Sequence, residues 1–174
     1  MTSHAQPASV GAGASDTQAR VLRRALGQFA TGVTVITTLD RERQPVGLTA
    51  NSFAALSLEP PLVLWSLREA SPSLAAFDAT GRFVVNVLTE AQVELSRRFA
   101  SPVEDKFAEV AFAMNVDGIP LLHGAAAWFE CRTVTRQTAG DHILFIAEVE
   151  RFATSEQAPL VFHGGGYHAL GSRL

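Results

Sequence analysis

The clearest pattern in the chain is an alternation of apolar and polar residues in its C-terminal half. It covers two segments, 124–136 and 142–152, separated by the residues QTAGD at 137–141. A period of two places the apolar side chains on one face of a β-strand, and Gly and Asp are typical turn residues. The pattern therefore predicts two long antiparallel strands joined as a hairpin. The apolar face would carry Ala125, Ala127, Phe129 and Cys131 on the first strand and Ile143, Phe145, Ala147 and Val149 on the second.

Shorter runs of β-branched and apolar residues predict further strands. They are 33–39 (VTVITTL), 46–58 after a polar turn at 40–45, 62–67 (LVLWSL) after Pro60 and Pro61, 83–88, and a last pair at 160–162 and 167–170 around the glycines 164–166. In the first run Val33, Val35, Thr37 and Leu39 share one face. The run at 62–67 is continuously apolar, which is typical of a buried strand.

Three helices with recognisable ends are expected between these strands. The first has a capping box at Ser15 and Gln18 and ends by Gly32; the second follows Ser71-Pro72 over 73–79 before Gly81; the third has a capping box at Thr89 and Gln92. The apolar rows would be Val21, Leu22, Ala25, Leu26 and Phe29 on the first helix, and Ala91, Leu95 and Phe99 on the third. Turns and hairpins link most strands, so we expect a mainly β fold with short helices, built as an antiparallel barrel.

Length and composition restrict the function more than they identify it. The 174 residues fit one domain, with a disordered arm at 1–15 and a folded part at 16–174. A net charge of −3 gives no basic field for nucleic acid. The single cysteine, Cys131, excludes an intrachain disulfide and is expected to be a small core residue in a protein of the reducing cytoplasm. No apolar run is long enough for a membrane span, and the start of the chain does not resemble a signal peptide.

Several enzyme signatures are missing from the sequence. It contains no G-x-x-x-x-G-K-[ST], H-E-x-x-H or G-x-S-x-G pattern. The five histidines do not have the spacing of metal ligands, so no metal site is expected, although His163 and His168 could meet across the glycine loop. Gly11 and Gly13 follow no predicted strand and are interpreted as linker.

Eight short stretches, taken in order, resemble the short-chain flavin reductases of two-component flavin-dependent monooxygenases, a group of the FMN-binding split barrels. They are 31–38 (TGVTVITT), 47–61 (GLTANSFAALSLEPP), 82–88 (RFVVNVL), 95–100 (LSRRFA), 105–107 (DKF), 120–122 (PLL), 128–132 (WFECR) and 140–142 (GDH). The resemblance runs from about Arg23 to Leu170. It implies a homodimeric split β-barrel that binds FMN or FAD, takes a hydride from NADH or NADPH, and supplies reduced flavin to a separate oxygenase. A flavin-binding storage or sensing protein without turnover and an FMN-dependent amine oxidase remain alternatives, since a fold does not dictate chemistry.

The candidate site residues combine side-chain chemistry with this resemblance. An isoalloxazine ring needs an apolar slot with hydrogen-bonding groups at its pyrimidine edge, and Thr49 to Ser52 can supply them. Arg98, Lys106 and the Ser71–Ser73 helix start are suitable for the flavin phosphate. The resemblance places His142 near the nicotinamide, where its ring could donate a hydrogen bond to the carboxamide.

The complete set contains one candidate catalytic residue, His142, and no metal ligand. The candidate cofactor-binding residues are Thr34, Thr49, Ala50, Asn51, Ser52, Phe53, Leu67, Ser71, Ser73, Arg98, Lys106, Phe107, Gly140, Asp141, His142 and Tyr167. Two of them also have ordinary structural explanations: Gly140 as a turn glycine, and Tyr167 as an aromatic that fills one end of the barrel. Many proteins of the family that the chain resembles carry a basic residue before this tyrosine, where the present chain departs from the pattern with Gly166.

Overall fold

The computed structural model describes residues 16–173, so the predicted arm at 1–15 and the capping contact of Ser15 lie outside it. The helices are α1 (Asp16–Leu26), α2 (Leu74–Thr80), the 3₁₀ turn η1 (Glu90–Gln92) and α3 (Val93–Ala100). The strands are β1 (Thr31–Gly32), β2 (Thr34–Leu39), β3 (Pro45–Ala50), β4 (Ala54–Leu58), β5 (Pro61–Arg68), β6 (Arg82–Val87), β7 (Phe112–Met114), β8 (Pro120–Leu122), β9 (Ala127–Ala139), β10 (His142–Thr154), β11 (Val161–His163) and β12 (Gly166–His168). No described helix is long and apolar enough to cross a membrane.

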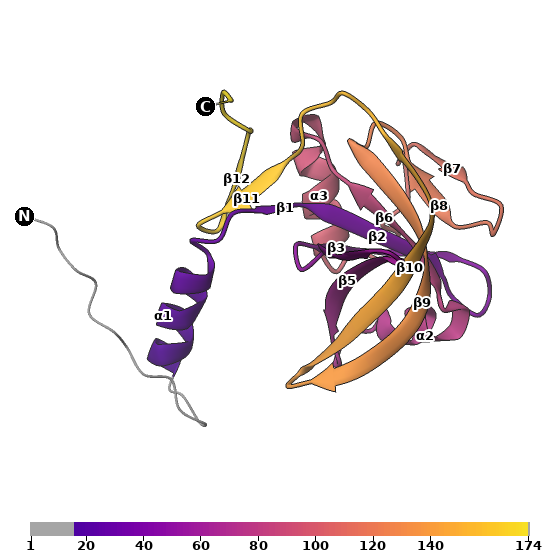
Figure 1. Cartoon of the computed structure of the whole chain (residues 1–174), viewed down its shortest axis with the longest axis horizontal. Helices are drawn as coiled ribbons and strands as arrows, with labels where there is room; N and C mark the ends of the chain where they lie inside the picture. Colours follow the sequence, from indigo (N-terminus) through magenta and orange to yellow (C-terminus); the bar gives the residue numbers. More distant parts are fainter. Residues whose placement is uncertain (1–15, 174) are drawn as a thin grey trace, which may run out of the picture.

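One curved antiparallel sheet forms the body of the molecule (Figure 1). Its strand order is β3-β2-β6-β9-β10-β5-β4, and smaller sheets are formed by β1-β11-β12 and by β7-β8. The two edge strands, β3 and β4, are separated in sequence only by residues 51–53. Four residue steps from Ala50 to Ala54 span at most about 14 Å, so the sheet must curl until its edges approach each other. The predicted mainly β fold, an antiparallel split barrel, is confirmed.

The long hairpin of β9 and β10 is also confirmed, but its turn is shorter than predicted. Residues 137–139 continue the strand, and Ala139 pairs with His142, which leaves only Gly140 and Asp141 in the turn. Gly140 has a φ of +64°, the pattern of a type II′ turn with glycine at its first central position. The turn residues Gly and Asp were recognised, but the ladder that extends to them was not.

Burial of two predicted strands differs from their sequence patterns. All six residues of β2 are buried, not one face only, because β2 lies between β3 and β6 and is covered on both sides. Val35 packs in one apolar cluster and its neighbour Ile36 in another. In β5 the opposite holds: the run at 62–67 alternates, with Val63, Trp65 and Leu67 buried and the residues between them half-buried.

The predicted helix ends were partly right. The capping box of Thr89 and Gln92 is present, although it opens the η1 turn, and α3 begins at Val93. The N-cap of α2 is Ser73, not Ser71, whose hydroxyl accepts a hydrogen bond from the Ser73 N–H at 3.3 Å. Gly81 ends α2 at a φ of +59°, as predicted.

The core of the barrel is aromatic. The Trp65 ring stacks on Phe145 with ring centroids 4.7 Å apart and meets Phe77 and Phe83 edge-on. Geometry of this kind adds to the free energy gained from area burial alone. Cys131 is buried in the same cluster, as predicted, and burial raises its pKa to about 12. It is therefore a neutral thiol at physiological pH.

Helix α3 packs against β3 because Gly47 has no side chain. A Cβ added at Gly47 would lie 2.6 Å from Cε1 of Phe99, a ring that is buried in the second apolar cluster. Phe99 in turn meets Phe107 edge-on, with centroids 5.0 Å apart. A glycine in the strand thus sets the distance between the sheet and the helix.

Replacing Gly47 should therefore destabilise the fold. We expect Gly47→Ala to cost about 1–3 kcal/mol of unfolding free energy, because the Phe99 ring must move away from a packed position. Urea denaturation would measure it. The matched control is Gly32→Ala, where an added Cβ meets nothing within 4 Å. Equal stability of the two variants would contradict the close approach.

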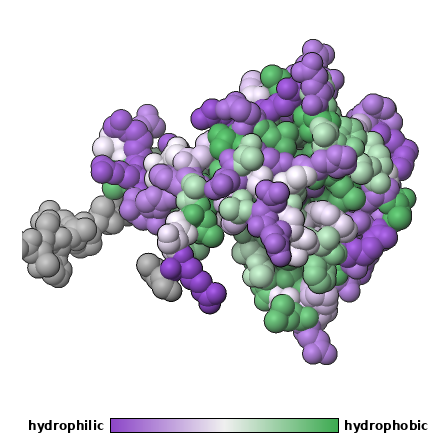
Figure 2. Space-filling model, turned by 90° about the horizontal axis from the view of Figure 1, so that it is seen from above, coloured by the Kyte–Doolittle hydropathy of each residue, from purple (hydrophilic) through white to green (hydrophobic). Residues whose placement is uncertain are grey.

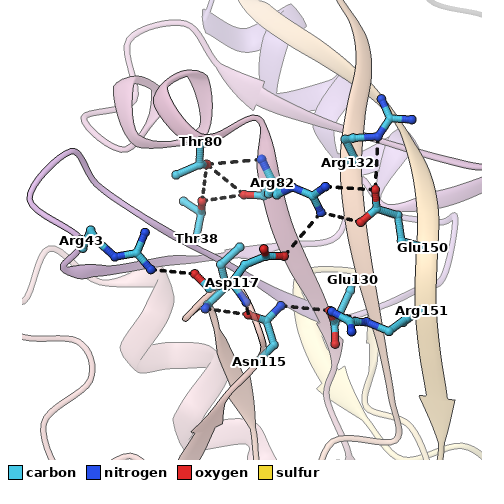
Figure 3. Close-up of polar contacts among 11 residues, drawn as sticks. Thr38, Arg43, Thr80, Arg82, Asn115, Asp117, Glu130, Arg132, Glu150 and Arg151 are labelled. Carbon is cyan, nitrogen blue, oxygen red and sulfur yellow. Dashed lines mark hydrogen bonds and ion pairs between the residues drawn. The ribbon is translucent and has the colours of Figure 1, made fainter.

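Charged side chains form a network on the face of the sheet opposite the aromatic core (Figure 3). Arg82 on β6 forms an ion pair with Glu150 on β10. Its Nη1 is also 3.4 Å from a carboxylate oxygen of Asp117 in the β7–β8 turn. Arg132 on β9 binds the same Glu150 at 3.2 Å. Nearby, Arg151 and the Asn115 amide bind the carboxylate of Glu130, each with a contact at 3.0 Å. The network therefore ties three strands of the sheet to the β7–β8 turn.

Acid should weaken this network. The hydrogen bond from Arg82 holds the pKa of Glu150 below its ordinary value of 4.5. A depressed folded-state pKa contributes stability above the unfolded pKa, and this is lost as the pH falls through the folded value. We expect the stability difference between the wild type and Glu150→Gln to be constant near neutral pH and to shrink below about pH 4.5. Thermal melts across pH would test this. Glu94→Gln, at an exposed pair on α3, should show a smaller difference.

Candidate functional site

A groove of about 620 Å³ opens where the two edges of the sheet approach each other. Its walls come from the end of β3 and the crossing to β4, the end of β5 with the start of α2, and the C-terminal end of α3. The predicted residues that line it are Thr49, Ala50, Asn51, Ser52, Leu67, Ser71, Ser73, Lys106 and His142. Segments far apart in the sequence therefore converge on one surface.

The two hydroxyl groups of the 49–53 segment form hydrogen bonds with backbone groups of neighbouring elements. Thr49 donates to the carbonyl of Ser96 on α3 at 2.7 Å. The Ser52 hydroxyl donates to the carbonyl of Ser66 and accepts from its N–H, both at 3.0 Å, which fastens the crossing to β5. Because the single hydroxyl proton of Ser52 is engaged, only its remaining lone pair is open to a ligand.

Asn51 differs from its neighbours. It is exposed, and no side chain or backbone group of the described residues forms a hydrogen bond with its amide. An amide offers two donors and an acceptor, so Asn51 can recognise a heterocycle edge that carries both kinds of group. Ala50 beside it is buried and small, and its carbonyl accepts from Thr34 at 2.7 Å. Thr34 thus lies behind the groove and supports it.

Lys106 contributes a cation to the groove wall. Its ammonium donates to the carbonyl of Phe99 at 2.9 Å and is 3.4 Å from that of Gly47. Burial lowers the pKa of Lys106 from its usual range. The first carbonyl belongs to the last turn of α3, where carbonyls lack helical partners. Lys106 therefore both caps α3 and places a positive charge beside the groove.

The structure brings other predicted residues close to the groove without placing them in its wall. Arg98 donates to the carbonyls of Lys106 at 2.9 Å and Asp105 at 3.3 Å, so it positions the segment that carries Lys106. Phe107 packs on Phe99, and Phe53 packs on Phe129 with ring centroids 5.7 Å apart. These aromatic rings belong to apolar clusters.

Tyr167 also lies away from this groove. Its ring meets Phe162 edge-on at a centroid distance of 5.5 Å, and the Arg97 guanidinium lies 5.8 Å from its centre. Its hydroxyl is 2.9 Å from the Ser96 hydroxyl. Within one chain these are the contacts of a packed aromatic residue on the small sheet, and a contact of Tyr167 with a cofactor stays a prediction.

The start of β10, directly after the β9–β10 turn, contributes His142 to the groove wall. His142 lines the groove, and its Nδ1 is 2.7 Å from Oδ1 of Asp141. This contact lowers the pKa of the Asp141 carboxyl. Asp141 and Gly140 are outside the wall, at the exposed tip of the hairpin.

Sequence reasoning missed several wall residues. The most informative is Arg68, which follows the predicted apolar strand directly and places a second cation near His142. A charged residue directly after an apolar strand sequence could have been recognised as a candidate for the end of the strand, where binding sites form. The others have no chemical signature of their own: Leu48, Ser66, Ala70, Pro72, Phe99, Ala100, Ser101 and Pro102.

The side chains that line the groove fit a ligand with a planar heteroaromatic ring and an anionic tail. Leu48, Ala50 and Leu67 supply apolar contact, Asn51 supplies an uncommitted amide, and Lys106 supplies positive charge. Sites for cofactors of this kind are mostly apolar with a few placed polar groups. His142 offers a further polar group in the same wall.

Comparison with known proteins identifies the family of this chain. A probable flavin reductase of Rhizobium meliloti is 46% identical over 148 residues, which cover 85% of this chain and 48% of that protein. The reductase subunit HsaB of a flavin-dependent monooxygenase from Mycobacterium tuberculosis is 44% identical, over 87% of this chain and 82% of the relative. The chain thus spans about half the length of some curated relatives.

Solved structures agree with these sequences. Flavin reductase PheA2 superposes with a TM-score of 0.81 at 41% identity, covering 88% of this chain and 98% of PheA2. The Streptomyces globisporus NADH:FAD oxidoreductase SgcE6, in complex with NAD and FAD fragments, superposes with a TM-score of 0.84 at 36% identity, covering 90% and 95%. The family model described as "Flavin reductase like domain" matches residues 26–171. This chain belongs to the flavin reductase like domain family.

Proposed function

We propose that the protein is a flavin reductase that passes a hydride from NADH or NADPH to FMN or FAD and supplies the reduced flavin to a separate oxygenase. The observation that carries the proposal is the groove, which gathers Asn51, Lys106 and His142 from three separate segments. Relatives support it by name, among them the NADH-dependent FMN reductase SmoA of Agrobacterium fabrum, at 43% identity. The buried lone thiol of Cys131 fits the reducing cytoplasm, where we place the reaction.

Each wall residue has a distinct part in this proposal. The flavin supplies a ring that accepts the hydride when it is bound. Asn51 offers its amide to the pyrimidine edge, where negative charge grows on reduction. Lys106 neutralises the phosphate, and His142 orients the nicotinamide. Because hydride passes directly between two rings held about 3–3.5 Å apart, the protein contributes mainly position and exclusion of water.

The direct test is steady-state oxidation of NADH and NADPH with FMN, FAD and riboflavin in turn. We expect NAD(P)H oxidation that depends on added flavin. A protein that binds flavin tightly but oxidises neither nucleotide would instead be a flavin-binding storage protein. The same assay also decides between the two flavins and between the two nucleotides.

Removal of the Lys106 charge should discriminate between flavins. A charge-assisted hydrogen bond contributes about 1.5–3 kcal/mol, or roughly one to two decades of affinity. We therefore expect Lys106→Met, which keeps the aliphatic stem, to weaken FMN by that factor and riboflavin far less, measured by flavin fluorescence. Arg97→Met removes the same charge from α3 outside the groove and is the control. Equal losses for both flavins would assign Lys106 to the support of α3 alone.

We also propose that the protein is a homodimer, because the apolar face of α1 is exposed in one chain and a second copy would cover it. None of the residues of α1 is buried, and the helix stands apart from the barrel (Figure 1). Its predicted apolar row is exposed, with Leu26 66% and the following Phe29 79% accessible. Apolar side chains are also spread over the body of the molecule in Figure 2. An amphipathic helix is stabilised in water chiefly by covering its apolar face.

If α1 forms the dimer interface, a charge in its apolar row should weaken the association of the two chains. Burying one large apolar side chain is worth about 1.5–3 kcal/mol, or roughly one to two decades in the dissociation constant. We expect Leu26→Asp to raise the dimer dissociation constant by at least that factor in sedimentation experiments. Arg20→Ser, on the polar side of α1, is the control. A wild-type monomer with full reductase activity would contradict the proposal.

A further inference from the structure

The β9–β10 turn places a carboxylate against the histidine of the groove. Oδ1 of Asp141 is 2.7 Å from Nδ1 of His142. His142 lines the groove, whereas Asp141 lies at the exposed tip of the hairpin and is not part of the wall. Asp141 therefore reaches the groove through its neighbours His142 and Arg68, and the hydrogen bond to His142 is the shorter of the two contacts.

The backbone holds this pair in place. The carbonyl of Asp141 accepts from the N–H of Glu69 at 3.0 Å, which ties the turn to the segment after β5. His142 pairs with Ala139 on one side and with Arg68 on the other. The Arg68 guanidinium lies 3.9 Å from the second carboxylate oxygen of Asp141. The carboxylate is thus positioned between a cation and the imidazole.

This arrangement determines which ring nitrogen carries the proton in neutral His142. An ionised carboxylate can only accept hydrogen bonds, so Nδ1 must be the donor. The hydrogen bond from His142 lowers the pKa of Asp141, which keeps the carboxylate ionised near neutral pH. In a neutral imidazole the other nitrogen, Nε2, then bears a lone pair and accepts.

We propose that Asp141 is a positioning residue that holds His142 in its Nδ1–H tautomer, so that Nε2 accepts a hydrogen bond from the carboxamide N–H of the nicotinamide. The inference rests on the proposed reductase function. It reverses the direction expected from the sequence, in which the ring donates to the carboxamide. An accepting Nε2 requires a ligand that donates a hydrogen bond, and the carboxamide of a nicotinamide has an N–H group that can do so.

Nitrogen NMR of the histidine ring tests the tautomer without any turnover. At pH 8, we expect His142 of the wild type to show a protonated Nδ1 and a lone pair on Nε2. Asp141→Ala should populate the Nε2–H form, and Asp141→Asn should lie between, since its amide oxygen can still accept. Glu69→Gln removes a neighbouring carboxylate and should leave the His142 signals unchanged. Identical tautomer populations in the wild type and Asp141→Ala would overturn the proposal.

Kinetics with two nucleotides test the direction of the hydrogen bond. Reduced 3-acetylpyridine adenine dinucleotide replaces the carboxamide with a methyl ketone, which has no N–H to donate. We expect Asp141→Ala to raise the KM for NADH several-fold, with little change in kcat or in the KM for flavin, and not to raise the KM for the analogue, because the Nε2–H of the variant can donate to its ketone oxygen. In a His142→Ala background, Asp141→Ala should have no further effect on NADH.

The possible failures are separable. Equal KM increases for NADH and the ketone analogue would show that His142 does not accept from the carboxamide, while the reductase function stands. Further loss from Asp141→Ala in the His142→Ala background would show that Asp141 does not act through the histidine. Absence of NADH oxidation in the wild type would remove the proposed function and the nicotinamide contact together, while NMR would still report the tautomer.

Discussion

The structure depends on one short connection. β3 and β4 are the opposite edges of the seven-stranded sheet, yet only residues 51–53 separate them. A connection of this length forces the sheet to curl, and it must cross the gap that the curled sheet leaves. The groove lies at that gap. The constraint that shapes the barrel thus also places Asn51 and Ser52 in the candidate flavin site.

Polar groups around the groove serve two different purposes. The hydroxyls of Thr49 and Ser52 are engaged with backbone groups of α3 and β5, because partly buried polar atoms left unpaired are costly. These bonds hold the walls at a fixed separation. The Asn51 amide has no such partner among the described residues, and the Asp141 contact leaves Nε2 of His142 for a ligand. Within the 49–53 segment, Thr49 and Ser52 therefore stabilise the groove walls, while Asn51 is free to bind a ligand.

The apolar surface of the chain is divided in a similar way. The barrel buries its own aromatic core around Trp65, whereas α1 buries nothing within the described chain. The crossing residues Asn51 and Ser52 also line the space between α1 and the barrel. Association through α1 would therefore act close to the groove, which links assembly to the proposed flavin site.

Much of the fold followed from the sequence because its signals are local. Alternation predicted β9 and β10, β-branched residues predicted β2, and a capping box marked the start of η1. Burial on both faces of β2 did not follow, because it depends on which strands become its neighbours. The turn at Gly140 and Asp141 was recognised by composition, but its length depends on pairing across the ladder.

The candidate site shows the same division between local and tertiary information. The sequence determined the residue types, including the 49–53 segment, Lys106 and His142. Only the tertiary structure decided that Arg98 binds backbone carbonyls, that Tyr167 packs against Phe162, and that Arg68 joins the groove wall. The reason is physical: a side chain's chemistry is fixed by its identity, but its partners are fixed by contacts between segments that are distant in sequence.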